Sequence, residues 1–364
     1  MHPFTLTLLD WFRENGRSLP WRETRDPYAI WLSEVILQQT RIEQGRPYWE
    51  RFMRRWPTVG DLAAASEDEV LREWQGLGYY SRARNLHEAA RQIVLRGGFP
   101  TTFDGLRTLK GVGDYTAAAI GSFAFNLPVA VVDGNVYRVL ARHFGIDTPI
   151  NTTEGKHVFS ALAQSLLPSL PSGGPGWASL YNQAIMDFGA TQCTPASPKC
   201  SLCPLQETCC AFRENRVAEL PVKLKTLKVK ERHFTYIYIR HNGQTALHRR
   251  PAGDIWQGLY EPLLVEGGEF ATAHEQGQTS ANSTAVANST LYTLNSKLIR
   301  HNVRHVLTHR IIYADFYLWE PEERPTLPDG YFWIDEADID RYALPRLVEL
   351  LLEEVRRQQQ ERKL

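Results

Sequence analysis

The stretch Leu109-Lys-Gly-Val-Gly-Asp-Tyr-Thr-Ala117 is a short Gly-X-Gly turn between two segments whose apolar residues follow helical spacing. We expect a helix to open at Tyr115, directly after Gly111 and Gly113. Backbone N–H groups lack partners at a helix N-terminus, so this turn would suit an anion such as a phosphate. A plain tight turn accounts for the same residues, and this motif alone does not separate the two interpretations.

A second motif, Val129-Ala-Val-Val-Asp-Gly-Asn-Val136, places Asp133 22 residues after Gly111. Asp133 precedes an amphipathic stretch, so its simplest role is to cap a helix N-terminus. The N–H bonds that a capping carboxylate accepts would keep it ionised. An ionised carboxylate at this point could also stabilise positive charge developing on a deoxyribose.

A third motif, Trp31-Leu-Ser-Glu-Val-Ile-Leu-Gln-Gln-Thr40, carries another carboxyl. Ile30, Glu34 and Leu37 share one face of the expected helix. A carboxyl on an apolar face is costly to ionise, so we expect a raised pKa for Glu34. One carboxyl with a raised pKa and one held ionised form an acid/base pair suited to glycosidic bonds. A solvated glutamate on a mixed face is the alternative.

All five cysteines lie between residues 193 and 210, and four of them follow the spacing C-x6-C-x2-C-x5-C. A secreted disulfide framework would spread its cysteines through the chain, so this clustering indicates a metal centre. Four thiolates suit either a [4Fe–4S] cluster or tetrahedral zinc. The expected ligands are Cys193, Cys200, Cys203 and Cys209. Cys210 lies outside the pattern, and Lys199, between the first two ligands, could meet a phosphate.

The 364 residues include 41 basic and 41 acidic ones, so the net charge is zero. This balance argues against a strongly basic coat, although local clusters of arginine and lysine remain as possible phosphate contacts or, more simply, solvated faces. No apolar run reaches the roughly 18 residues that span a bilayer. The first residues show no secretory signal, so we expect a cytoplasmic protein.

Apolar spacing predicts an all-α first part and an α+β second part. The expected helices are 4–12, 29–44, 61–74, 83–95, 115–123, 136–144 and 176–189. The expected strands are 234–240, 245–248, 259–265, 303–308 and 311–319, followed by a helix at 344–358. The polar residues 270–297 are expected to form a surface loop.

The hairpin, the spacer, Asp133 and the four cysteines together resemble the helix-hairpin-helix glycosylase superfamily and its iron–sulfur branch. Further blocks resemble the adenine DNA glycosylases of the MutY family: 19–22, 31–40, 76–86, 132–136 and 181–189. The resemblance implies an all-α helix-hairpin-helix DNA glycosylase domain with a [4Fe–4S] loop over 1–212 and a linker over 213–231. It implies an α+β Nudix-like 8-oxoguanine-recognition domain over 232–364.

The same resemblance implies roles for individual residues. Glu34 resembles the general acid that protonates adenine N7, and Asp133 the carboxylate that faces the oxocarbenium sugar. Asn135 and Tyr115 resemble hydrogen-bonding supports of that carboxylate. Gln39 and Tyr79 resemble wedges that fill the helix when adenine leaves it, and Arg22 and Gln183 resemble adenine-pocket residues. The expected DNA and substrate contacts are Arg22, Gln39, Thr40, Tyr79, Gly111, Gly113, Gln183, Thr308 and His309.

The Nudix-like part lacks the R-E-x-x-E-E run that holds Mg²⁺ in active Nudix hydrolases, at least between residues 232 and 350. We therefore expect it to recognise the base opposite adenine. The family reads 8-oxoguanine with a Phe-Ser-His loop, and this chain has Leu307-Thr-His309 at that point. The hydroxyl and the imidazole remain, so His309 is the better candidate, and a structural histidine at a strand end is the alternative.

Lyases of the superfamily, such as endonuclease III, carry a lysine two residues after the second hairpin glycine. This chain has Tyr115 there, and Lys110 lies within the hairpin. We therefore expect a monofunctional, monomeric, nucleoid-associated adenine glycosylase in base excision repair, acting on A:8-oxoguanine or A:G mispairs in duplex DNA. The alternatives are an endonuclease III-like glycosylase/lyase for oxidised pyrimidines and a non-catalytic mismatch-binding module.

Overall fold

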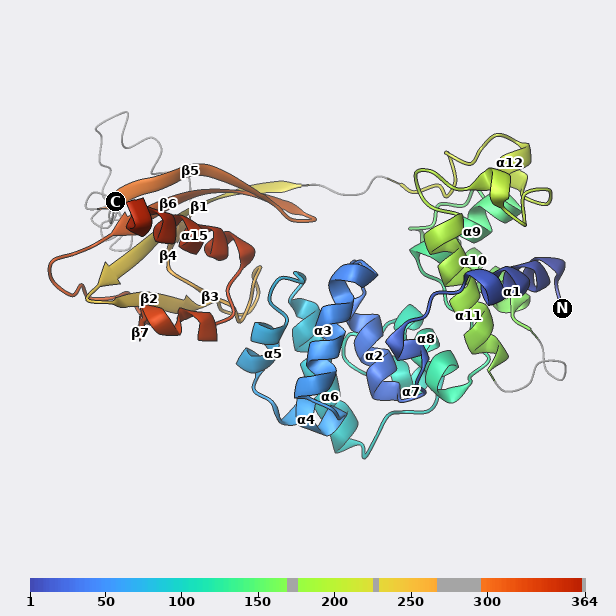
Figure 1. Ribbon diagram of the computed structural model, residues 1–364, viewed down its shortest axis with the longest axis horizontal. Helices are drawn as coiled ribbons and strands as arrows, with labels where there is room; N and C mark the ends of the chain where they lie inside the picture. The colour runs from blue at the N-terminus through green and yellow to red at the C-terminus, as the bar shows by residue number, and fades with distance from the viewer. Residues whose placement is uncertain (169–175, 225–228, 267–295, 362–364) are drawn as a thin grey trace. The chain divides into compact units, whose positions relative to one another are not determined.

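The computed structural model describes residues 1–168, 176–224, 229–266 and 296–361, and the chain divides into two compact units (Figure 1). The first unit comprises Met1–Ala65 and Arg84–Lys225, and the second comprises Ser66–Ala83 and Thr226–Leu364. None of the helices in these described ranges is both long and apolar enough to cross a membrane.

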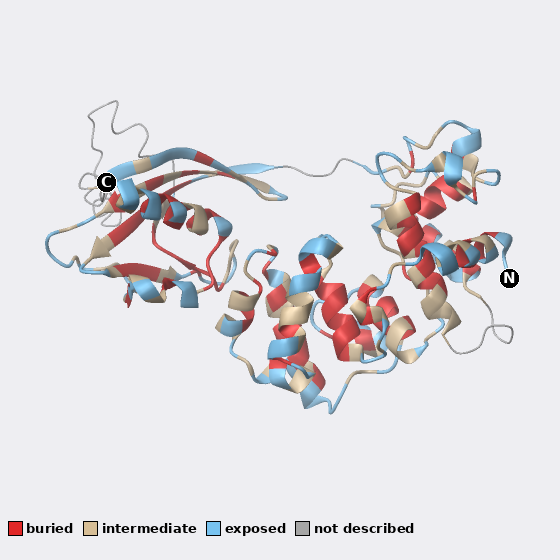
Figure 2. Ribbon diagram, viewed as in Figure 1, coloured by how far each residue is buried: buried red, intermediate tan, exposed pale blue. Residues whose placement is uncertain are grey.

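The first unit is helical throughout, as the apolar spacing predicts. Its helices are α1 (Pro3–Asn15), α2 (Pro27–Ile36), α3 (Ile42–Arg55), α4 (Val59–Ala64), α6 (Ser81–Leu95, which starts in the second unit), α7 (Phe103–Arg107), α8 (Asp114–Phe125), α9 (Gly134–Phe144), α10 (Thr153–Leu166), α11 (Trp177–Asp187) and α12 (Cys210–Arg213). Helix α2 packs on α8, and α1 packs on α11. The buried faces of these helices form the core of the unit, drawn red in Figure 2.

Three of the predicted helices differ clearly from the observed ones. The predicted helix 29–44 ends at Ile36, because the chain turns through Leu37–Thr40 and Gln39 adopts a left-handed backbone with φ +57°. The predicted helix 61–74 is two helices, α4 and α5 (Glu67–Glu73). Ser66 starts the second with a capping box, in which its side chain and that of Glu69 bond each other's backbone N–H groups.

Helix α11 also ends before the predicted limit of Gly189. It ends at Asp187 and continues into a π-helical turn, Phe188–Gln192, which leads directly to Cys193. Helices α3, α7 and α10 were not identified as separate helices from the sequence; α7 has only five residues, too few for a periodic signal.

The second unit is built on a mixed sheet, which confirms the predicted α+β class. Its strands are β1 (Lys230–His241), β2 (Gln244–Arg249), β3 (Tyr260–Glu261), β4 (Leu263–Glu266), β5 (Lys297–Val306), β6 (Arg310–Trp319) and β7 (Tyr331–Asp335). The order is β3-β2-β1-β6-β5, with β4 pairing β1 and β7 pairing β2. Strands β1 and β6 run parallel, with Tyr236 opposite Phe316.

Helix α15 (Arg346–Glu361) packs its apolar side chains against one face of this sheet. Leu347 and Leu351 lie fully buried beside Phe234 and Phe316. Strand β7 was missed, because a five-residue strand exposed on one face gives little alternation to detect. The predicted loop 270–297 lies, as far as residue 295, outside the described residues.

The domain bounds remain a prediction. Within the segment 213–231, which was expected to be a linker, Leu220 is buried in the core of the first unit. Val222 accepts a backbone hydrogen bond from Ile150, and Leu224 exchanges two hydrogen bonds with the Asn151 side chain. The chain as far as residue 224 therefore packs on the helical unit.

Candidate active site

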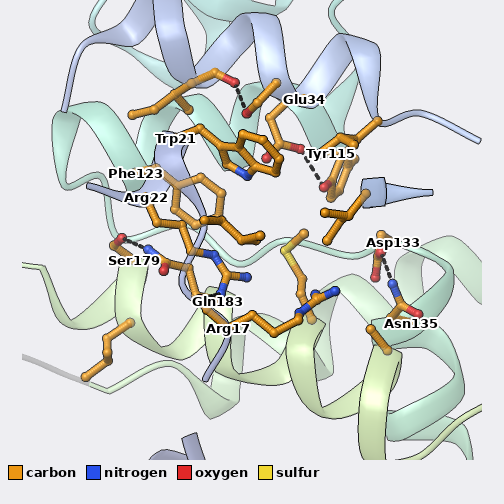
Figure 3. A pocket seen from close by; sticks show the side chains of 18 of the residues that line it. Arg17, Trp21, Arg22, Glu34, Tyr115, Phe123, Asp133, Asn135, Ser179 and Gln183 are labelled. Carbon is orange, nitrogen blue, oxygen red and sulfur yellow. Dashed lines mark hydrogen bonds between the residues drawn. The ribbon is translucent and has the colours of Figure 1, made fainter. Parts of the chain in front are cut away.

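A cavity of about 570 Å³ lies within the first unit, lined by side chains of α2, α8, α9 and α11 (Figure 3). It brings together seven of the catalytic and contact residues expected from the sequence: Arg22, Glu34, Thr40, Tyr115, Asp133, Asn135 and Gln183. Ile30 and Leu37 line it as well, so the predicted shared face of Ile30, Glu34 and Leu37 is confirmed.

Glu34 lies on α2, whose start is fixed by the Asp26 side chain as N-cap and by Pro27 in the first turn. Only 8% of Glu34 is exposed. Burial raises its pKa to about 7, with a further increase from the nearby Asp133 carboxylate. A hydrogen bond from Tyr115 and the charge of Arg22 act in the opposite direction. The predicted raised pKa is confirmed, and this carboxyl can carry a proton near neutral pH.

Tyr115 contacts a different carboxylate from the one expected. Its hydroxyl donates to Glu34 Oε2 at 2.6 Å, and the expected support of Asp133 by Tyr115 is wrong in this structure. The first turn of α8 points the ring at α2 and not at the start of α9. Burial raises the pKa of Tyr115 well above its usual value, so the hydroxyl remains a donor.

Asp133 caps α9, as predicted. Its side chain accepts hydrogen bonds from Val136 N and from Asn135 Nδ2, both at 2.8 Å. Asn135 therefore does support this carboxylate. However, burial raises the pKa of Asp133 and outweighs these hydrogen bonds and the charge of Arg138. The hydrogen bonds favour the ionised form, as expected, but nothing in the sequence indicated the burial that opposes them.

Arg22 lines the cavity but is held by a carboxylate that sequence reasoning missed. It donates to Asp187 Oδ1 at 2.7 Å and to Oδ2 at 2.8 Å. Arg17 bonds the same carboxylate through its backbone and side chain. Burial raises the pKa of Asp187, but the hydrogen bonds and charges of the two arginines lower it overall. Asp187 lies inside the block 181–189 that resembles the family, so that block is where the sequence could have indicated a functional role for it.

Gln183 and Thr40 also line the cavity. Gln183 lies on α11, where its Nε2 donates to Ser179 Oγ at 3.0 Å (Figure 3). Thr40 lines the cavity, whereas Gln39 is exposed on the adjoining turn and is not among the lining residues.

The glycine hairpin lies at the start of α8. Gly111 has φ +75°, and a Cβ there would come within 2.7 Å of Asn85 Cβ, so only glycine fits. Gly113 occupies the N-cap of α8, which begins at Asp114, one residue earlier than predicted. Gly111 and Gly113 are exposed, and no side chain among the described residues caps this helix end.

The second unit holds Tyr79, Thr308 and His309. Leu307, Thr308 and His309 form the turn between β5 and β6, which begins earlier than predicted because β5 ends at Val306. Thr308 and His309 are exposed, and Leu307 packs against the core of the unit. The Tyr79 hydroxyl lies 2.6 Å from Thr308 Oγ1, so two residues predicted to contact DNA are hydrogen-bonded to each other.

Comparison with known proteins identifies the family. Residues 32–164 match the model described as HhH-GPD superfamily base excision DNA repair protein, and residues 235–354 match the NUDIX domain. An adenine DNA glycosylase of Buchnera aphidicola subsp. Schizaphis graminum is 34% identical over 263 residues, covering 71% of this chain and 74% of the relative. The chain belongs to the adenine DNA glycosylase family. The predicted membership is therefore confirmed.

Other relatives of this adenine DNA glycosylase family member are longer. The adenine DNA glycosylase of Arabidopsis thaliana is 39% identical over 312 residues, and the match covers 73% of this chain but 48% of the relative. The chain thus spans about half the length of that protein. A solved thermostable thymine-DNA glycosylase matches 58% of this chain and 95% of its own, with 30% identity and a TM-score of 0.53.

The four expected cluster ligands, Cys193, Cys200, Cys203 and Cys209, follow the π-helical turn, which ends at Gln192. Burial, together with the neighbouring thiols of Cys193, Cys209 and Cys200, raises the pKa of Cys203 to about 11. The four thiols are therefore within electrostatic reach of one another. In the described ranges of the chain, no three His, Cys, Asp or Glu side chains are arranged to hold a metal ion as they stand.

A buried arginine, also missed from the sequence, fixes the loop that carries these thiols. Arg142 on α9 is 3% exposed. Its guanidinium donates to Thr194 O at 2.8 Å, to Pro195 O at 3.0 Å and to Leu220 O at 3.0 Å. Its Nη1 also lies 3.5 Å from Cys193 Sγ. Cys210, in contrast, lies against Gly145 and Arg213.

Proposed function

We propose that this chain is a monofunctional DNA glycosylase that releases adenine from A:8-oxoguanine or A:G mispairs in duplex DNA and leaves an abasic site. The observation that carries the proposal is the cavity that holds Glu34 and Asp133 together. Membership of the adenine DNA glycosylase family supports the choice of base.

Glu34 supplies the proton. Its pKa of about 7 means that a large fraction of the carboxyl is protonated at neutral pH, whereas an ordinary glutamate would be almost entirely ionised. Transfer of that proton to adenine N7 turns the base into a better leaving group. The Tyr115 hydroxyl, 2.6 Å away, orients the carboxyl during this step and accommodates the charge that remains on it.

Asp133 stabilises the sugar. When the N-glycosidic bond breaks, the electron pair leaves with the base and the deoxyribose becomes positively charged. Asp133, fixed by Val136 N and by Asn135, presents a carboxylate to that charge. Water then adds to the sugar carbon and gives a proton to the Glu34 carboxylate left by the first step, which yields the abasic site and restores the acid. Burial raises the pKa of Asp133 in the free protein, but the positive charge on the sugar would lower that pKa again and favour the ionised carboxylate.

The side chains around the cavity support the monofunctional assignment. No lysine is among its lining residues in the described parts of the chain, and the hairpin position of the lyase nucleophile holds Tyr115. Without an amine, a Schiff base with the abasic sugar does not form.

The donor set of the cysteine loop fits a [4Fe–4S] cluster held by Cys193, Cys200, Cys203 and Cys209. The four thiols match the ligand number of such a group, and the Arg142 cation beside Cys193 suits its net negative charge. When bound, the cluster would cross-link the loop and could take part in electron transfer. Arg142 would hold the loop's backbone in register, and Lys199, which is exposed, would be free to meet a phosphate.

The second unit would read the base opposite adenine. The exposed Thr308 and His309 offer a hydroxyl and an imidazole that can bond the polar edge by which 8-oxoguanine differs from guanine. We further propose that the protein acts as a cytoplasmic, nucleoid-associated monomer.

The decisive experiment is a single-turnover glycosylase assay on A:8-oxoguanine and thymine-glycol duplexes, each with and without alkaline treatment. Adenine release that yields strand breaks only after alkali supports the proposal. Release from thymine glycol with spontaneous breaks would favour the lyase alternative, and binding without release would favour the mismatch-binding module.

A further inference from the structure

The turn Gly76–Tyr79, between α5 and α6 in the second unit, presents an exposed aromatic ring on a strained backbone. Tyr79 has φ +46°, in the left-handed region that residues with a side chain rarely adopt. Its side chain is 49% exposed, so burial does not compensate this cost. Such a conformation persists only where neighbouring groups hold it in place.

Two side chains hold the carbonyl groups of this turn. Arg82 Nη2 donates to Leu77 O and Gly78 O, each at 3.3 Å, and Trp74 Nε1 donates to Gly78 O at 3.0 Å. The backbone N–H of Arg82 donates to Tyr79 O at 2.9 Å. Three consecutive carbonyls are therefore bonded to Arg82 or Trp74.

Arg82 also contacts the aromatic rings on either side of the turn. Its guanidinium carbon lies 5.1 Å from the centroid of the Trp74 ring and 5.7 Å from that of Tyr79, within range of a cation–π interaction. Burial lowers the pKa of Arg82 to about 10, so the group is still cationic at neutral pH. At its far end, the Tyr79 ring is bonded through its hydroxyl to Thr308.

We propose that Arg82 is a positioning residue for Tyr79, and that its guanidinium holds the ring ready to enter the base stack before DNA binds. The proposal rests on the proposed function, from which Tyr79 takes its role as a wedge. A wedge that is already ordered loses less conformational freedom on binding. Lysine is not an equivalent replacement, because its ammonium group has no planar face to lie over the Trp74 and Tyr79 rings while it donates to the two carbonyls.

The test uses the full chain and four variants: Arg82→Lys, Tyr79→Ser, the double variant, and Arg91→Lys as a matched control. Arg91 is an exposed arginine on the same helix. A 2-aminopurine beside the target adenine reports unstacking, and half-saturation for A:8-oxoguanine DNA is measured in single-turnover assays. Arg82→Lys should weaken half-saturation and unstacking on the order of tenfold, as loss of a charge-assisted hydrogen bond would give. It should have no further effect once Tyr79 is serine, and Arg91→Lys should change neither quantity.

Two outcomes would overturn the inference: an Arg82→Lys defect that persists undiminished in the Tyr79→Ser background, or one no larger than that of Arg91→Lys. Hydrogen exchange of the amides of residues 77–81 in the DNA-free protein provides an independent readout. Arg82→Lys should speed that exchange, while the thermal midpoint of the chain stays close to that of the wild type. If the wild type released no adenine, the proposed function would fail, and hydrogen exchange would still decide whether Arg82 holds the turn.

Discussion

The Tyr115 hydroxyl donates a 2.6 Å hydrogen bond to Glu34 Oε2, joining the first turn of α8 to the middle of α2. This bond favours the ionised form of Glu34 and so opposes the effect of burial on its pKa. Tyr115 therefore lowers the fraction of Glu34 that is protonated at a given pH.

This relationship predicts a shift in pH dependence. Adenine release needs protonated Glu34, so the single-turnover rate should fall as the pH rises through about 7. Tyr115→Phe removes the bond that lowers the pKa, and the alkaline limb should move to higher pH. A pH–rate profile of both proteins from pH 5 to pH 9 tests this. An unshifted or downward-shifted limb would mean that the tyrosine does not tune the acid.

Glu34→Gln should abolish adenine release while leaving DNA affinity close to that of the wild type, because the amide keeps the shape of the side chain but carries no acidic proton. Single-turnover assays and binding measurements on the same A:8-oxoguanine duplex provide the comparison. Release near the wild-type rate would remove Glu34 from the role of general acid.

The same substitution should stabilise the protein at alkaline pH. The folded-state pKa of Glu34 is raised from 4.5 to about 7, so the contribution of this group to stability is greatest below pH 4.5 and is lost as the pH rises towards 7. The loss is on the order of 3 kcal/mol above pH 7, at about 1.4 kcal/mol for each pKa unit. Thermal unfolding of Glu34→Gln and wild type should differ little at pH 4.5 and clearly at pH 8. An equal difference at both pH values would contradict the assignment.

The cysteine loop predicts a brown protein with broad absorption near 400 nm and about four irons per chain. Cys203→Ser should reduce the iron content, whereas Cys210→Ser, on the thiol that lies against Gly145, should leave it intact. If the anaerobically purified protein contained stoichiometric zinc and no iron, the four cysteines would form a zinc site and not a [4Fe–4S] site.

His309→Ala should weaken binding to A:8-oxoguanine several-fold and binding to A:G much less, since one hydrogen bond to a neutral group contributes about 0.5–1.5 kcal/mol. Adenine release from the bound complex should change little, because Glu34 and Asp133 belong to the other unit. Both duplexes are compared at one fixed salt concentration. If affinity for the two duplexes fell equally, His309 would not be the residue that distinguishes 8-oxoguanine from guanine.

Local patterns predicted those features that depend on local physics. The helix cap of Asp133 and the face shared by Ile30, Glu34 and Leu37 both follow from residues within one or two turns. The helix-hairpin-helix and Nudix-like architecture, in contrast, came from the resemblance, since spacing alone left the hairpin open to a plain turn.

Pairs of residues that are distant in the sequence and adjacent only in the fold could not be predicted from local patterns. Asp187 lies 165 residues from Arg22, and nothing near either residue indicates their pairing. The burial that raises the pKa of Asp133 was out of reach for a related reason: its hydrogen bonds are local to the helix start, whereas its depth is set by the packing of the whole unit. Likewise, only the path of α8 decides that Tyr115 faces Glu34 and not Asp133.

The starts of α8 and α9 differ in one respect that affects how DNA would be held. Asp133 fills the N-terminus of α9 with a carboxylate from the chain itself, whereas α8 starts at Gly113 with no capping side chain among the described residues. Of the two, α8 is the end that can grip a phosphate from outside. Tyr115, on its first turn, touches the acid. A phosphate bound at this helix start would lie within one turn of the residue that contacts Glu34, so α8 would set the spacing between that phosphate and the base that receives the proton.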